Sequence, residues 1–200
     1  MESLTQKDRT RARILDEAAK AMREHGVDGV GVAALMKKAG LTHGGFYAHF
    51  ASRDDLVAHS VDRMFQDSSR LLDRHLIDGE AAVRIASLID AYLSVAALRS
   101  LDSGCPLPGL SGEARRMPDA ARRRFAEGVE TFLGALERVL TELGRPEPRA
   151  LAASVLSELV GTMALARTID EEKAMRVLER GRTTMKRRLQ LDGKGLEVTA

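Results

Sequence analysis

Apolar residues recur along the chain at the spacing of α-helices. Ile14, Ala18 and Met22 follow one another at intervals of four residues, which places them on one face of a helix that ends before Gly26. The alternation that is typical of strands is most nearly approached at 27–32, where two glycines interrupt it. Ala, Leu, Arg and Glu, which favour helices, dominate most other segments. The sequence therefore predicts an all-α protein.

The positions of glycine, proline and capping residues divide the rest of the chain. Ser52 with Asp55 three residues later forms a capping-box pattern that opens a long helix toward His75. The segment 102–112 contains two prolines and three glycines, which predicts a loop or a broken helix. The polar last nine residues, 192–200, are expected to fray. Further helices are predicted for 8–25, 32–39, 43–50, 80–101, 118–143, 149–168 and 170–191.

Composition narrows the class of protein without indicating a function. The 200 residues include 31 Lys and Arg against 29 Asp and Glu, so a function that depends on charge requires local clustering. The single cysteine excludes an intramolecular disulfide and a multi-cysteine metal site. The first residues are polar, and no stretch approaches the roughly 20 apolar residues that a membrane span needs. We expect a soluble, cytoplasmic protein with neither a metal nor a cofactor.

The segment 32–56 carries the most specific pattern. Two short helices joined by a tight connection at 39–42 have the form of a helix-turn-helix, and Gly40 gives that turn its backbone freedom. Phe46 and Phe50, four residues apart on the second helix, are predicted to face a small core. The opposite face is then available to enter the major groove of DNA, while flanking groups hold phosphates. That face presents His43, Gly44, Tyr47 and Ala48.

Residues 40–56 resemble the signature of the TetR/AcrR family of bacterial transcriptional regulators. An aromatic-Tyr-x-His-Phe element is followed by Ser, a basic residue, two acidic residues and Leu, here at 46–50 and 52–56. The resemblance implies an N-terminal three-helix DNA-binding domain at 1–51. It also implies a C-terminal helical domain at 52–191 that binds an effector, with 52–75 as the connecting helix. The implied protein is a homodimer, most commonly a repressor on a palindromic double-stranded DNA operator, at the nucleoid in the bacterial cytoplasm.

The resemblance also assigns DNA-contacting roles to residues on and around the second helix. Gly31, Met36 and Gly45 depart from the family pattern, which has Thr or Ser, a small residue and a longer side chain there. Because glycine inside a helix costs about 1 kcal/mol relative to alanine, we expect a recognition helix that is loose before DNA orders it. Thr42 is expected to cap that helix. Phosphate contacts are implied for Lys38, Thr42, Tyr47 and Arg53, base contacts for His43, Gly44 and Gly45, and a supporting or backbone contact for His49.

The last two predicted helices are implied to form the dimer interface. Small residues such as Ala152, Gly161 and Ala164 permit close approach of neighbouring helices. A dimer also suits the mechanism, because two half-sites on DNA require two recognition helices about 34–36 Å apart. Packing inside one subunit is the alternative for every interface candidate. These candidates are Leu156, Leu159, Val160, Met163, Met175 and Leu178.

Aromatic and sulfur-containing side chains are candidates for a pocket that takes a small apolar, aromatic or electrophilic effector. Cys105 follows Gly104 at the break between two predicted helices. A subgroup of the family that senses electrophiles and responds to N-ethylmaleimide has a cysteine after a glycine at a similar place. Ordinary core packing, and for Cys105 an inert thiol, are the alternatives. The candidates are Phe65, Tyr92, Cys105, Phe125, Phe132 and Met163.

Two other functions remain open. An enzyme with Cys105 as nucleophile requires a nearby base, but all five histidines lie at or before position 75. A helical module that binds a small molecule or a partner protein without DNA leaves the pattern at 40–56 unexplained. The basic runs at 115–116, 122–124 and 186–188 are expected to be solvated helix faces. Basic residues ahead of and within the first helix are better placed to reach phosphates, namely Lys7, Arg9, Arg11 and Arg13.

Overall fold

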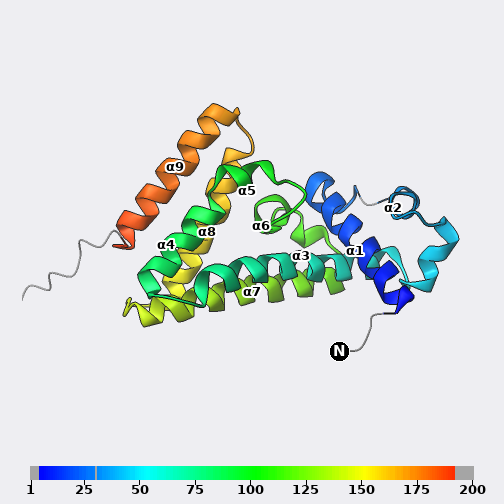
Figure 1. Cartoon of the computed structure of the whole chain (residues 1–200), viewed down its shortest axis with the longest axis horizontal. Helices are drawn as coiled ribbons and strands as arrows, with labels where there is room; N and C mark the ends of the chain where they lie inside the picture. Colours follow the sequence, from blue (N-terminus) through cyan, green and yellow to red (C-terminus); the bar gives the residue numbers. More distant parts are fainter. Residues whose placement is uncertain (1–4, 30, 192–200) are drawn as a thin grey trace, which may run out of the picture. The chain divides into compact units, whose positions relative to one another are not determined.

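The computed structural model describes residues 5–29 and 31–191, and all regular structure in this part of the chain is helical. The first helix begins at a capping box, in which the Thr5 hydroxyl accepts a hydrogen bond from the Asp8 N–H at 3.2 Å and the Asp8 carboxylate accepts one from the Thr5 N–H at 3.1 Å. The predicted all-α class is confirmed, whereas the predicted tail at 192–200 lies outside the described residues. In chain order (Figure 1) the elements are α1 Gln6–His25, α2 Val32–Lys38, η1 His43–Ala48, α3 Arg53–Leu76, α4 Ala81–Tyr92, α5 Val95–Arg99, α6 Leu107–Leu110, η2 Ala114–Arg116, α7 Asp119–Glu142, α8 Pro148–Ala166 and α9 Glu171–Arg188.

The predicted helix at 80–101 is two helices rather than one. The N–H of Leu93 closes α4 by donating to the carbonyl oxygen of Ile89 at 3.0 Å. One residue later the Ser94 hydroxyl caps α5 by accepting a hydrogen bond from the Ala97 N–H at 3.0 Å. Apolar spacing does not reveal this interruption, because the segment contains neither glycine nor proline and a serine is tolerated inside a helix.

Packing divides the described residues into two compact units. The first combines those of Met1–Ser68 with Leu101–Gly128, and the second combines those of Ser69–Ser100 with Val129–Ala200. Helices α3 and α7 each supply residues to both units. The segment that contains α6 and η2 therefore packs with the N-terminal helices. A functional domain boundary after residue 51 stays a prediction, because these units reflect packing alone.

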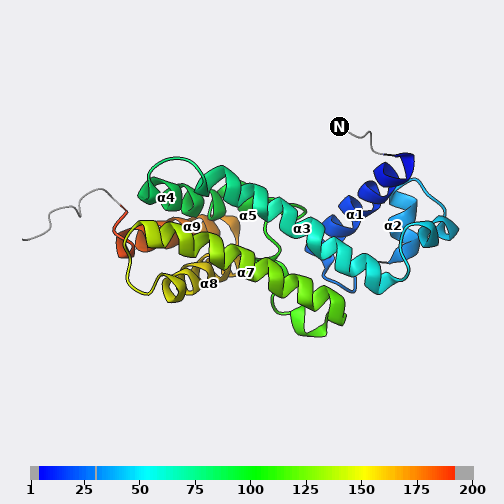
Figure 2. The ribbon, with the colours of Figure 1, turned by 90° about the horizontal axis from the view of Figure 1, so that it is seen from below.

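The first unit has a continuous apolar core beneath its N-terminal helices. Ile14 and Met22 of α1 are fully buried, as the periodicity predicts. Figure 2 shows α1 and α2 beside the beginning of α3, which contributes the fully buried Leu56. Leu35 and Met36 of α2 complete this part of the core. Burial of these side chains, each stabilising by roughly 1.5–3 kcal/mol relative to exposure, holds the short helix α2 in place.

A glycine in α7 allows an aromatic ring of α3 to lie against the helix backbone. A Cβ atom at Gly128 would come within 2.4 Å of the Phe65 ring, so a larger residue requires the ring to move. The ring of Phe65 also meets that of Phe125 edge to face, with centroids 5.3 Å apart. Gly128 thus costs about 1 kcal/mol of helix propensity relative to alanine and gives the space that the ring occupies.

In the second unit α8 and α9 follow one another as a helical hairpin (Figure 1). A Cβ atom at Gly181 of α9 would come within 2.9 Å of Thr162 on α8, so the small residue permits close approach of the two helices. The buried Arg84 of α4 donates a hydrogen bond to the Leu76 carbonyl oxygen at 2.9 Å and forms an ion pair with Glu142. This arginine joins the ends of α3 and α7 to the first turn of α4.

Two segments of the second unit, Ala81–Arg99 and Pro148–Ala166, are long and apolar enough by length and composition to cross a membrane. The expectation that no stretch comes close to this limit is therefore wrong. The first segment is interrupted between Tyr92 and Val95, where α4 gives way to α5. The second is α8, which packs against α9. Core helices of helical proteins have the same composition, and this interpretation fits the packing of both segments.

Candidate DNA-binding site and effector region

The second helix of the helix-turn-helix is the 3₁₀ helix η1 rather than the α-helix expected at 43–50. Hydrogen bonds from the Gly45 N–H to the Thr42 oxygen, at 3.1 Å, and from the His49 N–H to the Phe46 oxygen, at 2.9 Å, each span three residues. Two adjacent glycines lower the preference of this segment for an α-helix. Thr42 precedes η1 but makes no capping hydrogen bond through its side chain, so the predicted cap is also wrong.

Aromatic rings fix the inner side of η1. Phe46 and Phe50 are 1% and 2% exposed, and their stacked rings have centroids 5.6 Å apart, which confirms that both face the core. The guanidinium of Arg11 lies 4.8 Å from the centroid of the Phe50 ring and adds a cation–π contact from α1. The outer side of η1 is available to a partner, since Tyr47 is 68% exposed. Lys38, Thr42, His43 and Gly44 are exposed as well, whereas Gly45 and His49 are half-buried.

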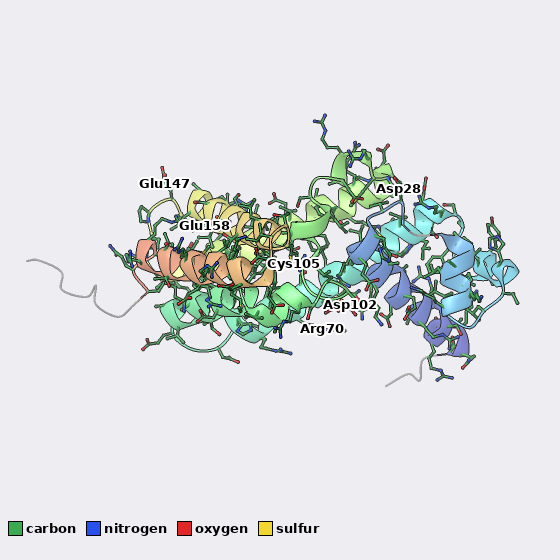
Figure 3. All side chains as sticks on the ribbon, turned by 90° about the horizontal axis from the view of Figure 1, so that it is seen from above. Asp28, Arg70, Asp102, Cys105, Glu147 and Glu158 are labelled. Carbon is green, nitrogen blue, oxygen red and sulfur yellow. The ribbon has the colours of Figure 1, made fainter. Side chains whose placement is uncertain are left out.

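Arg53 connects the beginning of α3 to the turn between α1 and α2. Its Nη2 donates a hydrogen bond to the Val27 carbonyl oxygen at 2.7 Å and lies 3.6 Å from the carboxylate of Asp28, which Figure 3 labels in this turn. The preceding Ser52 hydroxyl accepts a hydrogen bond from the Asp55 N–H at 3.1 Å, which confirms the predicted capping pattern. Arg53 therefore has a structural role within the unit, and its phosphate contact stays a prediction.

The same turn is held from a second direction by Glu113, which lies between α6 and η2. The Glu113 carboxylate accepts a hydrogen bond from the Val27 N–H at 2.9 Å. Gly26 has a φ of +75°, which favours glycine, and a Cβ atom there would come within 2.6 Å of that carboxylate, so a larger residue would require the Glu113 side chain to shift. Sequence patterns give no signal for this contact, because its two residues are 86 positions apart.

Charged side chains connect α1 to α3 within the first unit. Arg63 pairs with Asp16 and with Asp67 at 2.6 Å each, and Arg23 pairs with Asp67 at 2.8 Å. The side chain of Arg23 is 5% exposed and also donates to the Asp102 carbonyl oxygen at 3.2 Å. Burial by itself raises the pKa of Asp67, but hydrogen bonds from Arg63 and Arg23 outweigh it and hold that pKa below its usual value. These contacts fix the orientation of α1 on α3.

Three of the effector candidates belong to the first unit. Phe65 and Phe125 form the buried edge-to-face pair described above. Cys105 is half-buried in the loop ahead of α6, where Figure 3 labels it together with Asp102. The structure brings the two rings together. The roles of all three residues in effector binding stay predictions.

The other three candidates belong to the second unit. Tyr92 and Phe132 meet edge to face with ring centroids 6.1 Å apart, and both are buried, as is Met163. Ordinary core packing accounts for these contacts without a ligand. A separate surface hollow of about 510 Å³ involves none of the six candidates. It is lined by Glu137, Glu147, Pro148, Arg149, Ala150 and Ala153.

Four of the six interface candidates are buried within a single chain, so their contacts are intramolecular. They are Leu156, Leu159, Met163 and Leu178, for which the alternative of packing inside one subunit holds. Met175 of α9 remains 39% exposed, and Val160 is half-buried. A different set of small and apolar residues covers the outward side of α8 and the turn after it. This set comprises Ala150, Ala153, Ser154, Ser157, Leu165 and Ile169.

Two family models match the chain. The model of bacterial regulatory proteins of the tetR family matches residues 14–59, from the middle of α1 into α3. The model of a tetracyclin repressor-like C-terminal domain matches residues 81–181, from α4 into α9. No curated protein matches the sequence. The two matches divide the chain in the order that the resemblance at 40–56 implies.

Several solved structures have the same fold. A TetR transcriptional regulator from Chloroflexus aurantiacus is 22% identical, with a TM-score of 0.81 over 94% of this chain and 97% of that chain. NemR of E. coli in its reduced form is 21% identical, with a TM-score of 0.80 over 90% of this chain and 96% of that chain. A TetR transcriptional regulator from Legionella pneumophila is 19% identical, with a TM-score of 0.78 over 94% and 99%. These likenesses concern the fold.

The helix-turn-helix geometry and the family models lead to the same assignment. The N-terminal model covers α2, η1 and the first residues of α3, where the exposed side of η1 lies above its two buried phenylalanines. The C-terminal model alone covers half of the chain. The chain belongs to the TetR family of bacterial regulatory proteins, which are ligand-responsive DNA-binding transcriptional regulators.

Proposed function

We propose that the chain is a homodimeric repressor that binds a palindromic DNA operator and releases it when a small apolar, aromatic or electrophilic molecule binds. The observation that carries the proposal is the construction of η1. Its inner side is anchored by two stacked phenylalanines, while its outer side exposes a tyrosine, a histidine and a glycine toward solvent. A surface of this kind suits insertion into the major groove.

Phosphate contacts are proposed for exposed side chains that border η1. Lys38 ends α2, Thr42 precedes η1, and Tyr47 stands on its outer side. His43 and the backbone at Gly44 are then nearest to the base edges. Phosphate contacts carry no sequence information, whereas base contacts decide which operator is chosen. Because each neutralised phosphate releases counterions, binding weakens steeply as salt concentration rises.

A second copy of the chain is proposed to pack on the outward side of α8. Exposed small residues such as Ala153 and Ser157 allow another helix to approach closely, and Leu165 and Met175 add exposed apolar surface. Burial of such a patch in a dimer removes apolar area from water. Two copies also supply the two recognition elements that a palindrome requires, about 34–36 Å apart.

The residues proposed for effector binding are Phe65, Phe125 and Cys105 in the first unit and Tyr92, Phe132 and Met163 in the second. Cys105 is the residue proposed to react with an electrophilic effector, and as a residue it is only half-buried. A serine substitution at Cys105 that leaves release by an electrophile such as N-ethylmaleimide unchanged excludes this part of the proposal. Apolar and aromatic effectors then remain.

Catalysis and cofactors have no place in the proposal. Within residues 5–29 and 31–191 no group of three or more His, Cys, Asp or Glu side chains is arranged to hold a metal ion. The family consists of soluble transcription factors, which implies a cytoplasmic location, and we propose association with the nucleoid there.

Selection of bound duplexes from a random DNA pool tests the proposal. A palindromic enriched sequence, bound by two copies of the chain, is the expected result. Absence of enrichment at low salt contradicts DNA binding and favours the module that binds a small molecule or protein partner instead. Enrichment of a site bound by one copy contradicts the dimer but not the DNA contact.

Substitution of the exposed Tyr47 tests the division between phosphate and base contacts. Tyr47→Ala is expected to weaken binding to the selected operator and to unrelated duplexes by a similar factor, because a phosphate contact is independent of sequence. His43→Ala is the matched comparison, and it is expected to change which bases are preferred. Affinities of both variants for a panel of single-base operator changes provide the measurement. A change of base preference in Tyr47→Ala contradicts its assignment.

A further inference from the structure

We propose that Glu113 is a positioning residue that fixes the α1–α2 turn and thereby raises the affinity of the following helices for DNA. The inference rests on the proposed function. Its basis is the backbone of Val27, whose N–H and carbonyl oxygen each form a hydrogen bond with a side chain from another segment. The Val27 N–H donates to the Glu113 carboxylate at 2.9 Å, and the Val27 carbonyl oxygen accepts from Arg53 at 2.7 Å.

The N–H of Val27 depends on Glu113 because Val27 is buried. Val27 is 7% exposed, so water is a poor replacement for the Glu113 carboxylate as the acceptor of this hydrogen bond. Gly26 brings the carboxylate unusually close to the backbone, since a Cβ atom there would be 2.6 Å from it. The carboxylate thus lies directly against the turn, and we expect the position of the acceptor oxygen to matter more than its charge.

The segment that carries Glu113 has a second attachment to α1. Arg23, in the last turns of α1, donates to the carbonyl oxygen of Asp102 at 3.2 Å. The two attachments, at Asp102 and Glu113, enclose Cys105 and α6.

The α1–α2 turn links Glu113 to the elements that are proposed to contact DNA. Helix α2 begins at Val32, five residues after Val27, and is followed by η1 after the turn at 39–42. Neither element has a side-chain cap of its own, since no capping hydrogen bond forms at Gly31 or Thr42. Their orientation depends on the core beneath them and on the turn that Glu113 and Arg53 hold. Withdrawal of Glu113 releases one of these two restraints.

Three substitutions of Glu113 distinguish its role as a hydrogen-bond acceptor from the effect of its negative charge. Glu113→Gln keeps an oxygen acceptor at the same reach, Glu113→Asp keeps the charge but shortens the side chain, and Glu113→Ala removes both. We expect Glu113→Gln to bind the selected operator within about threefold of wild type, and Glu113→Asp and Glu113→Ala to bind about tenfold more weakly. Asp78→Ala, which removes an exposed acid outside the first unit, is the control and should change nothing.

Amide hydrogen exchange gives a second readout that needs no DNA. Peptides that cover the α1–α2 turn should exchange faster in Glu113→Asp and Glu113→Ala, while peptides from α8 keep the wild-type rate. Unchanged affinity and unchanged exchange in Glu113→Ala overturn the inference, and so does a Glu113→Gln variant that loses as much as Glu113→Ala. If the wild-type chain selects no duplex, the proposed function fails, and exchange alone decides whether Glu113 holds the turn.

Discussion

The first unit contains two regions that are held by very different interactions. Helices α1 and α3 are joined by ion pairs around Asp67 and share a fully buried core. The recognition element η1 has no side-chain cap, contains two adjacent glycines, and is anchored chiefly by Phe46 and Phe50. The contrast indicates that α1 and α3 form a well-fixed frame, whereas the reading surface, η1, is more easily deformed. That DNA completes the ordering of η1 stays a prediction.

The largest expected effect comes from removal of the anchor of η1. Phe46→Ala is expected to lower the free energy of unfolding by about 3 kcal/mol, because it empties a fully buried ring position. Tyr47→Ala, one residue away but exposed, should change it by less than about 0.5 kcal/mol. Urea unfolding followed by circular dichroism gives both values. Similar losses in the two variants would show that the inner and outer sides of η1 are not distinct.

Substitution of Asp67 tests the ion pairs that join α1 to α3. Asp67→Asn leaves the buried Arg23 without its carboxylate and should cost about 2 kcal/mol at neutral pH, whereas Asp73→Asn, on an exposed part of α3, should cost little. The folded pKa of Asp67 lies below its unfolded value. Its contribution is therefore complete above about pH 3.9 and is lost as pH falls through the folded pKa.

The pH profile separates this charge effect from simple packing. In the wild-type chain, stability should fall on the acid side partly because Asp67 becomes protonated in the folded state. Since Asp67→Asn lacks this titration, the difference in unfolding free energy between the two chains should shrink as pH falls. A difference that stays constant down to pH values below the folded pKa means that the carboxylate charge is not what Arg23 requires.

The smallest expected effect concerns the glycines of the reading surface. A Cβ atom at Gly44 meets nothing within 4 Å, and its backbone is not left-handed, so Gly44→Ala should stabilise the chain by about 0.5 kcal/mol. Gly40 has a φ of +68°, and Gly40→Ala should destabilise by about 1 kcal/mol despite equal space around it. Thermal unfolding of both variants checks the pair. A loss in Gly44→Ala would mean that η1 depends on glycine for its shape.

Local signals in the sequence predict the elements well. The repeat of Ile14 and Met22, the Ser52–Asp55 cap and the Phe46–Phe50 spacing all correspond to features of the structure. The 3₁₀ form of η1 does not follow from spacing, because the four-residue interval from Phe46 to Phe50 suggests an α-helix, whereas η1 ends at Ala48 and Phe50 lies beyond it. The break at Ser94 was missed for a similar reason, since it depends on a single hydroxyl that caps α5.

Contacts between distant segments account for what the sequence did not predict. Glu113 reaches Val27 across 86 positions, and Arg23 reaches Asp67 across 44, so neither pair has a local pattern. The interface candidates are a different case. The resemblance implies a dimer role for Leu156 and Leu159, with packing inside one subunit as the alternative; both are buried in the single chain, because apolar character does not distinguish intramolecular from intermolecular burial.

The ring of Phe65 fills the place that a side chain at position 128 would otherwise take. The size of residue 128 consequently sets how near α3 and α7 come to each other at that level. Alanine, serine and valine at this position form a series of increasing side-chain size. Each larger side chain is expected to push the Phe65 ring, and with it α3, further from α7. Such a series is expected to shift the position of α3 in steps, while the exposed residues of η1 remain unchanged.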